Sequence, residues 1–460
     1  MHHDDDVTAR ISAMVIEHLG QRVAMDDPPL DHSITMAEMA AEAPSLLTEH
    51  GNDPEVVFAQ FRDVLAPRIL SVDSPRFLSF IPAAPTKAAL LFDTVVSISS
   101  LNGISWLEAA GAVWAENQVL EWLADLAGFP AGSGGCFVSG GSAANLSALA
   151  VARDVVRHRS GLRAPAPATP HSSGRWRIVV SDQSHSSIAS ASHLLDTDLL
   201  VVDTVDGRLT GDLLERAVAA DGDPASVMAV VATAGTTNAG IVDDLAGIAR
   251  VAAANDWWFH VDGAYGGAGI LAPSVQSRYD GLEHADSFCV DPHKWLFGPF
   301  DCAALIYREP QLARATHTQD ASYLEVLHER PEEPNPTDYA YHLTRRARGL
   351  PMWFSLAVHG TGAYREAVET SLALARRAAR LIDGLDHVEL VLEPELSVVV
   401  FRRIGWDFED YQRWSRRMLD DQVAFVVPSR WRGEAVARFA FVHPDTTDEL
   451  VAEILASMAC

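Results

Sequence analysis

Seven short, almost continuously apolar runs alternate with helical stretches between residue 79 and about residue 310, and this alternation constrains the fold more than any other feature. The runs are residues 136–139, 176–181, 198–205, 227–234, 257–262, 286–291 and 302–307. Strands that are apolar on both faces are typical of a parallel sheet covered by helices on each side. Segments such as ANLSALAVARDVVRHR, which lie between the runs, space their apolar residues as helices do. The pattern predicts a large α/β domain.

The segments on either side differ from this central part. Residues 1–78 have apolar residues at helical spacing and little strand pattern, so we predict a helical arm that packs on something else, such as a partner subunit. After residue 351 a long helix leads to strands in VELVLE, LSVVVFRRI and VARFAFVH, which predicts a small α+β domain. Residues 161–175 and 330–341 contain several prolines and are expected to form surface loops. The chain therefore divides into an arm (1–78), a large domain (79–350) and a small domain (351–460).

Composition excludes several classes of protein. The 460 residues include 62 acidic and 35 basic ones, and the net charge of -27 opposes binding to nucleic acids or to anionic membranes. The 48% of hydrophobic residues predicts a large packed core, and no apolar run approaches the roughly 18 residues that span a bilayer. The four scattered cysteines fit neither a disulfide framework nor a metal site. Because the acidic N-terminus is unlike a secretory signal, we expect a cytoplasmic enzyme.

Ligands of open α/β sheets bind beyond the carboxyl ends of the strands, so the polar residues that follow each predicted strand are the candidate site residues. Run 136–139 is followed by residues 140–145, GGSAAN, at the start of a helix, where free N–H groups and the helix dipole favour an anion. The same segment also fits an ordinary glycine turn capped by Ser142, and it matches no dinucleotide-binding, P-loop or GxSxG motif. His185 follows run 176–181 and is a candidate ligand or base.

Asp262 and Lys294 are the most informative residues, because each follows closely on an apolar strand. Asp262 ends its strand, and a buried carboxylate requires a cationic partner. Lys294 is followed by Trp-Leu-Phe (295–297), an apolar setting that favours the neutral amine of a Schiff-base lysine. Together with the anion seat and His185, this order of residues matches pyridoxal phosphate, which requires a phosphate site, an acid at the pyridine nitrogen, a flat group over the ring and a lysine.

These residues lie in motifs that resemble the pyridoxal-phosphate-dependent group II decarboxylases, the aromatic-L-amino-acid and glutamate decarboxylase family. The resemblance rests on SDQSHSSI (181–188), ATAGTTNAG (232–240), HVDGAYGG (260–267) and DPHKWLFGPFDCA (291–303), and it extends over nearly the whole chain beyond the first few dozen residues. It implies fold type I, the pyridoxal-phosphate-dependent transferase fold similar to aspartate aminotransferase, with a helical arm and a small C-terminal domain. It also implies a homodimer whose active sites are shared between subunits.

The resemblance assigns a role to each matching residue. Lys294 would form the internal aldimine, Asp262 would pair with the protonated pyridine nitrogen, and His185 would stack on the ring. The remaining residues implied at the cofactor are Ser142, Ala143 and His293 at the phosphate, Thr237 and Ala264 beside the ring, and Asp243 behind them.

Two further parts of the site follow from the resemblance. The family's proton donor is a tyrosine on a mobile loop; Tyr339 in TDY matches it, but the stretch to Arg345 is shorter than in the animal enzymes, so Tyr341 competes for the role. The substrate-pocket wall corresponds to Phe80, Ile81, Ala83, Asn102 and Ile104. Because this wall holds no basic residue, an aromatic or large apolar L-amino acid is expected rather than glutamate or aspartate.

The expected activity is decarboxylation of such an amino acid to carbon dioxide and an amine. An aldehyde synthase is the main alternative, although in the family that activity accompanies phenylalanine at the loop-tyrosine position. An aminotransferase or another lyase of the same fold would use the same aspartate and lysine, but the HKW context and His185 favour decarboxylation. A metal hydrolase using His260, Asp262 and His293 is disfavoured, because we expect His260 and Asp262 to lie on opposite faces of their strand. A non-catalytic binding protein is least favoured, because each chemical position is filled.

Overall fold

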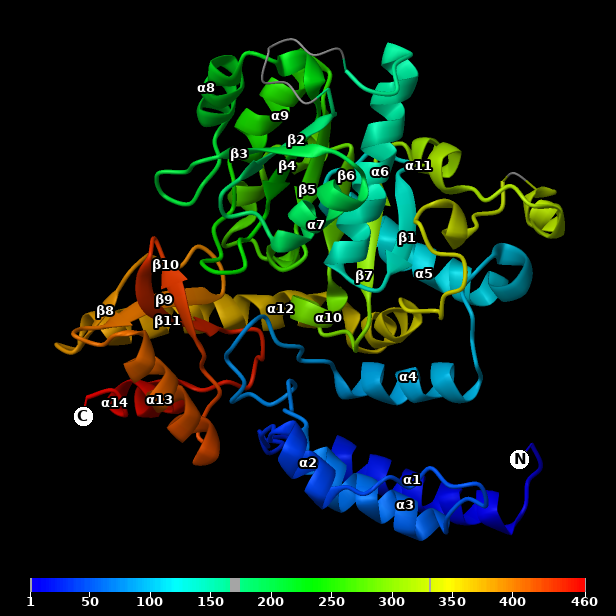
Figure 1. The fold of residues 1–460 in the computed structure, drawn as a ribbon, viewed down its shortest axis with the longest axis vertical. Helices are drawn as coiled ribbons and strands as arrows, with labels where there is room; N and C mark the ends of the chain where they lie inside the picture. The colour runs from blue at the N-terminus through cyan, green and yellow to red at the C-terminus, as the bar shows by residue number, and fades with distance from the viewer. Residues whose placement is uncertain (1, 166–173, 331, 460) are drawn as a thin grey trace.

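A seven-stranded sheet forms the centre of the molecule in the computed structural model, which describes residues 2–165, 174–330 and 332–459 (Figure 1). The strand order is β1-β7-β6-β5-β4-β2-β3. Each predicted apolar run forms one strand, which confirms the α/β prediction. The strands are β1 (Gly134–Val138), β2 (Arg177–Ser181), β3 (Asp198–Val202), β4 (Val227–Thr233), β5 (Trp258–Asp262), β6 (Ser287–Val290) and β7 (Ala303–Tyr307).

The sheet is mixed rather than fully parallel, which corrects the prediction. Strand β7 runs antiparallel to both of its neighbours, β1 and β6. A parallel connection needs a crossover of a dozen or more residues, usually with a helix on one face of the sheet. The segment 291–302 between β6 and β7 contains only the four-residue helix α10 (Pro292–Trp295) and turns back directly. Apolar residues on both faces report burial and not strand direction, so the sequence pattern did not distinguish the two arrangements.

Helices cover both faces of this sheet, because successive strand residues alternate between two apolar clusters. Val179 belongs to one cluster, whereas Ile178 and Val180 belong to the other. The cluster of Val179 includes residues of α5 (Trp106–Leu126), α8 (Gly211–Asp221) and α9 (Leu245–Asn255). The opposite cluster includes residues of α6 (Gly141–Ser160), α7 (Ser186–Leu194) and α11 (Pro310–His317). The ends of the strands are therefore the part of the sheet left open to a ligand.

The N-terminal segment is helical and has almost no core of its own. Helices α1 (Asp6–Val23), α2 (Met36–Glu42) and α3 (Pro54–Gln60) contain no buried residue. The chain continues through a π-helical turn (Phe61–Leu65) and reaches α4 (Lys87–Ile98). Figure 1 shows these three helices beyond α4, away from the central sheet. That this arm packs on another surface, such as a partner subunit, stays a prediction.

The long helix α12 (Leu350–Asp383) connects the large domain to the small one (Figure 1). It is interrupted at Gly360, whose φ of 77° only glycine adopts readily. The small domain has an antiparallel sheet in the order β10-β11-β9-β8. Strand β10 was missed from the sequence because its four residues, PSRW, are not an apolar run. The elements are β8 (Val388–Leu390), β9 (Val398–Arg403), α13 (Phe408–Asp420), β10 (Pro428–Trp431), β11 (Glu434–Ala440) and α14 (Asp448–Ala456).

Two further expectations concern loops and membranes. Of the surface loop predicted at residues 161–175, residues 166–173 lie outside the described part of the chain. In the loop predicted at 330–341, residues Pro336–Asp338 form a short 3₁₀ turn. Within the described ranges, no helix combines the length and the apolar character needed to cross a bilayer.

Candidate active site

A cavity of about 300 Å³ lies beyond the carboxyl ends of β1, β4, β5 and β6. This is the edge at which ligands of α/β sheets bind. The predicted residues that line it are Ser142, His185, Thr237, Asp262, Ala264, His293 and Lys294. They come from five separate stretches of the chain, so the tertiary fold brings together seven of the residues chosen from the sequence.

Lys294 lies on α10, and its amine is paired with a carboxylate that had no assigned role. The Nζ atom is 2.9 Å from Oδ2 of Asp291, which is buried. Burial acts to lower the pKa of the Lys294 amine, but the charge and hydrogen bond of Asp291 outweigh it and raise that pKa above its usual value. The expectation of a neutral amine was therefore wrong for this state. The Trp-Leu-Phe segment that suggested it is buried in the core, where Trp295 stacks on Tyr265.

Asp262 ends β5 in a buried hydrogen-bond network. Its Oδ2 accepts from Asn145 Nδ2 at 2.8 Å and its Oδ1 accepts from the backbone N–H of Ala264 at 3.0 Å. The Asn145 Oδ1 atom in turn accepts from His260 Nε2 at 2.8 Å. Burial lowers the pKa of His260, which keeps this imidazole neutral. Asp262 is 4% exposed and forms no ion pair within the described ranges, so it can accept a further charged donor from the cavity.

The same network corrects our expectation about His260 and Asp262. Side chains two residues apart on a strand share a face, and both of these contact Asn145 on α6. The argument used against a shared metal site was therefore unsound. Across the residues that the structure describes, no group of three His, Cys, Asp or Glu side chains is placed to hold a metal ion.

The first turn of α6 lies where the sequence predicted an anion seat. Gly141 opens this 20-residue helix, and a Cβ atom there would lie 2.8 Å from the Cβ of Ala264, so the position requires glycine. His293 completes the seat: its Nδ1 accepts from the backbone N–H of Cys302 at 3.0 Å. In the neutral ring the proton is therefore on Nε2, which can donate to an anion. The positive dipole end of a helix together with an imidazole donor suits a phosphate group.

His185 and Thr237 lie at the exposed rim of the cavity. His185 is the N-cap of α7, and its Nδ1 accepts from the backbone N–H of Ser187 at 3.1 Å, which fixes the imidazole. Asp243 lies behind the cavity, where its Oδ2 accepts from the backbone N–H of Thr233 at 2.7 Å. Burial raises the pKa of Asp243 to about 7. Ala143 adjoins the seat on α6 without lining the cavity, and its N–H donates to Gly140 O at 2.9 Å.

In a single chain, the loop tyrosines and the pocket-wall residues lie outside the lining of this cavity. Tyr339 packs against the cluster that includes Tyr307, whose hydroxyl donates to the Tyr339 carbonyl at 3.1 Å. Tyr341 is 55% exposed. The pocket-wall residues Phe80, Ile81, Ala83, Asn102 and Ile104 lie outside the cavity lining, and the side chain of Phe80 is 57% exposed.

Among the lining residues to which the sequence reasoning gave no role are Asn145, Asp291 and Phe300. Asn145 lies one helical turn after Gly141, so the start of α6 carried a signal for it. Asp291 directly follows β6 and was noted only as the end of that strand. Phe300 gave no signal, because an aromatic residue in a loop usually packs on its own domain.

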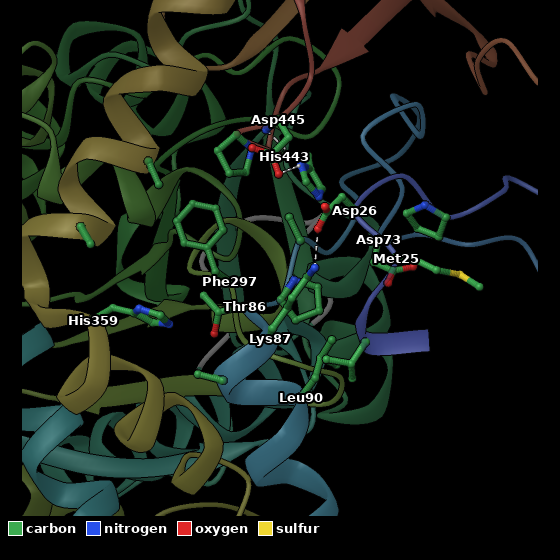
Figure 2. A pocket seen from close by; sticks show the side chains of 18 of the residues that line it. Met25, Asp26, Asp73, Thr86, Lys87, Leu90, Phe297, His359, His443 and Asp445 are labelled. Atoms are coloured by element: carbon green, nitrogen blue, oxygen red, sulfur yellow. Dashed lines mark hydrogen bonds and ion pairs between the residues drawn. The ribbon is translucent and has the colours of Figure 1, made fainter. Parts of the chain in front are cut away.

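A second cavity, of about 440 Å³, lies among the end of α1, the start of α4, α12 and the segment before α14 (Figure 2). Its charged groups are largely paired with one another: Lys87 pairs with Asp26, and Arg22 pairs with Asp73 at 2.7 Å. Lys87 and Lys294 are the only two lysines of the chain. Lys87 is half-exposed and its partner Asp26 is mostly exposed, whereas the side chain of Lys294 is 25% exposed and its partner Asp291 is buried. Of these two cavities, the first is therefore the one that combines a largely buried lysine, a buried carboxylate and an anion seat.

The chain is similar to known proteins in both sequence and fold. Residues 37–404 match the family model described as the pyridoxal-dependent decarboxylase conserved domain. An aromatic-L-amino-acid decarboxylase of Bacillus atrophaeus is 28% identical over 455 residues, which cover 96% of this chain and 92% of that protein. A 4-hydroxyphenylacetaldehyde synthase of Rhodiola rosea is 26% identical over 407 residues, covering 85% and 80%. The crystal structure of Oryza sativa TDC with PLP and tryptamine superposes with a TM-score of 0.87 at 24% identity, covering 100% of this chain and 99% of that one, which shows the shared fold.

Proposed function

Since the chain belongs to the pyridoxal-dependent decarboxylase family and is a pyridoxal-phosphate-dependent carboxy-lyase, we propose that it decarboxylates an aromatic or large apolar L-amino acid to the corresponding amine. The observation that carries this proposal is the placement of Asp262 and Lys294. A buried carboxylate without an ion-pair partner and a largely buried lysine line the same cavity as the α6 anion seat. These are the groups that pyridoxal phosphate requires for its ring nitrogen, its aldehyde carbon and its phosphate.

The charge of the cavity supports the proposed substrate class. No arginine lines it within the described ranges, and its carboxylates are Asp262 and Asp291. A glutamate or aspartate side chain would therefore approach two anions and find no cation beyond Lys294, which has to react. An uncharged side chain avoids this repulsion, and Phe300 at the cavity gives it an exposed aromatic surface to pack against.

We assign the following roles to the chain's own residues. Lys294 provides the amine that attaches the cofactor, and Asp262 holds a proton at the ring nitrogen. Asn145 fixes Asp262 through its 2.8 Å hydrogen bond, and His185 covers the ring from the rim. When bound, pyridoxal phosphate supplies an electron-poor ring that takes up the electron pair released as carbon dioxide leaves. The proton that replaces the carboxylate comes from a loop tyrosine, Tyr339 or Tyr341.

A second copy of the chain completes the site in this proposal. The apolar side chains on α4 and at the start of α5 are solvent-exposed in a single chain, although such patches on stable proteins are usually covered. They are Leu91, Val95, Ile98, Leu107 and Trp114, with exposed fractions of 45–81%. Phe80 and Tyr341 are likewise exposed and lie outside the cavity of their own chain, and in this proposal they face the partner.

The first experiment uses the two lysines. Borohydride reduction of the loaded protein, followed by peptide mass analysis, should place the cofactor on Lys294, and Lys294→Ala should abolish both the attachment and carbon dioxide release. The matched variant Lys87→Ala should retain both, because Lys87 lies in the other cavity. Attachment at Lys87, or carbon dioxide release by Lys294→Ala, would exclude the assignment.

The second experiment identifies substrate and product. The twenty amino acids are assayed for carbon dioxide and for amine, and aromatic or large apolar ones should be turned over fastest. Preferential turnover of glutamate would contradict the charge argument. Aldehyde and peroxide in place of amine would establish the alternative activity, an aldehyde synthase.

The third experiment tests the shared site. Tyr339→Phe and Tyr341→Phe are compared first, and the variant with the larger loss of turnover identifies the donor. That variant is then mixed with Lys294→Ala subunits under conditions that allow exchange. Recovery of activity in the mixture requires that one site draws residues from two chains, and a mixture as inactive as its components argues for a site within one chain.

A further inference from the structure

Residues 395–397 of the small domain, which directly precede β9, contact the large domain close to the cofactor cavity. Glu395 pairs with Arg208 and, at 2.9 Å, with Arg278. Its Oε2 atom also accepts from the backbone N–H of Val242 at 3.2 Å. The Glu395 side chain is only 16% exposed. Two guanidinium groups and a backbone donor on one largely buried carboxylate hold this segment on the large domain more firmly than an exposed ion pair would.

Leu396 packs against the backbone of two segments that belong to the cavity wall. A Cβ atom at Gly235 would lie 3.0 Å from the Cδ1 atom of Leu396, and a Cβ atom at Gly266 would lie 2.6 Å from it. Gly235 lines the cavity, and Gly266 directly follows Tyr265, which lines it as well. Leu396 is 1% exposed. Because buried side chains are close-packed, Leu396 leaves these two segments little room to shift.

Ser397 forms a polar contact between the two domains at the same wall. The Oη atom of Tyr265 accepts from the backbone N–H of Ser397 at 3.1 Å and lies 2.6 Å from its Oγ atom. Tyr265 is 3% exposed, and burial raises the pKa of its phenol well above the usual value, so the hydroxyl keeps its proton. The polar end of the phenol ring is thus held by the small domain.

Tyr265 connects this contact to the two groups that hold the cofactor in the proposed function. Its ring stacks on Trp295 with the ring centroids 5.4 Å apart, and Trp295 directly follows Lys294 on α10. Its neighbour in the chain, Ala264, donates from its backbone N–H to Asp262 Oδ1 at 3.0 Å. A shift of the phenol ring would therefore disturb the helix that carries the lysine and the turn that holds the carboxylate.

We propose that Ser397 is a positioning residue of the cofactor cavity, which acts from the small domain through Tyr265 on the two groups that hold the cofactor. Without the serine hydroxyl, the buried phenol loses a hydrogen-bond partner and its ring gains freedom of movement. The small domain is then part of the framework of the site, although none of its described residues lines the cavity. This inference rests on the cofactor site of the proposed function but not on the identity of the substrate.

Two substitutions delete the contact from opposite sides. Ser397→Ala removes the serine hydroxyl, and Tyr265→Phe removes the phenol hydroxyl while keeping the ring. Ser355→Ala is the matched control, because the Oη atom of Tyr364 donates to Ser355 Oγ at 2.7 Å. Both serines are 0% exposed, and neither Ser355 nor Tyr364 lines the cofactor cavity. The control therefore deletes the same kind of buried hydrogen bond elsewhere in the molecule.

Pyridoxal phosphate is titrated into each cofactor-free protein and followed by absorbance and by visible circular dichroism, which reports how the protein holds the bound ring. Ser397→Ala and Tyr265→Phe should each bind about tenfold more weakly and give a smaller dichroic signal. The double variant should bind no more weakly than the weaker single variant, because both substitutions remove the same bond. Ser355→Ala should match the wild type in both measurements, even where urea unfolding shows that it is less stable.

Wild-type affinity and dichroism in Ser397→Ala would overturn the proposal, as would additive losses in the double variant or an equal loss in Ser355→Ala. If Ser397→Ala does not fold, Tyr265→Phe and its counterpart Tyr364→Phe decide in the same way. Failure of the proposed function is a separate result, seen as absence of carbon dioxide release by the wild type with every amino acid.

Discussion

The ion pair between Glu116 and Arg345 is buried completely, and its removal should be costly. Glu116 on α5 accepts from Arg345 Nη1 and Nη2 and from the backbone N–H of Gly349, each at 2.8 Å. Arg345 Nη1 also donates to Gly103 O at 2.6 Å. The two side chains are 2% and 0% exposed. The pair thus fixes the segment that carries the loop tyrosines against α5 and against the pocket-wall residues beside Gly103.

The size of the effect follows from these contacts. Glu116→Leu leaves a buried guanidinium without its anion, and Arg345→Met leaves a buried carboxylate without its cation. Each should destabilise the large domain by about 3–5 kcal/mol. The double variant removes both charges and leaves only Gly103 O and Gly349 N–H unpaired, at about 1–3 kcal/mol each. The double variant should therefore cost about 2–6 kcal/mol, compared with about 6–10 kcal/mol if the single costs were additive.

Urea unfolding followed by tryptophan fluorescence measures these free energies. Arg377→Gln is the control, because its partner Asp448 lies 2.8 Å away in a pair whose side chains are 40% and 43% exposed. Such an exposed pair should contribute less than about 1 kcal/mol. The reasoning is refuted if Glu116→Leu costs no more than this control, or if the two single effects simply add in the double variant.

Three other substitutions test the cofactor seat and the loop before α12. Asp262→Asn should weaken pyridoxal phosphate binding by about 10- to 100-fold, because the charge-assisted bond to the ring nitrogen is lost; unchanged affinity in a spectroscopic titration would contradict this role. Gly141→Ala should also weaken cofactor binding while the circular dichroism spectrum stays native, because its Cβ would lie 2.8 Å from that of Ala264. Burial lowers the pKa of His342 from 6.5 to about 4 in the folded protein. As the pH falls from 6.5 to 4, the imidazole of the unfolded chain therefore binds a proton that the folded chain does not bind. The folded state loses up to about 3 kcal/mol of stability over this range. His342→Gln should lack this part of the acid loss when unfolding is measured at several pH values, and equal acid sensitivity would count against it.

Local sequence patterns predicted the elements well, because burial and helical spacing are properties of short segments. Every apolar run of the large domain became a strand, and the glycine-rich segment became the start of α6. Polar residues at strand ends identified Asp262 and Lys294 for the same reason. The direction of β7 was not predicted, because a short connection and its turn, rather than burial, decided it.

The contacts between these residues were decided by the tertiary structure alone. Gly141 and Asp291 are 150 positions apart in the sequence, yet a hydrogen bond joins them at the anion seat. The same holds for Asn145, which joins His260 to Asp262 across 115 and 117 positions. A sequence specifies which groups are present and which segments are buried. The distance between two groups that are far apart in the chain depends on how the segments pack, and only the tertiary structure decides it. The ion pair of Asp291 and Lys294 is different, because these residues are three positions apart and their contact is local.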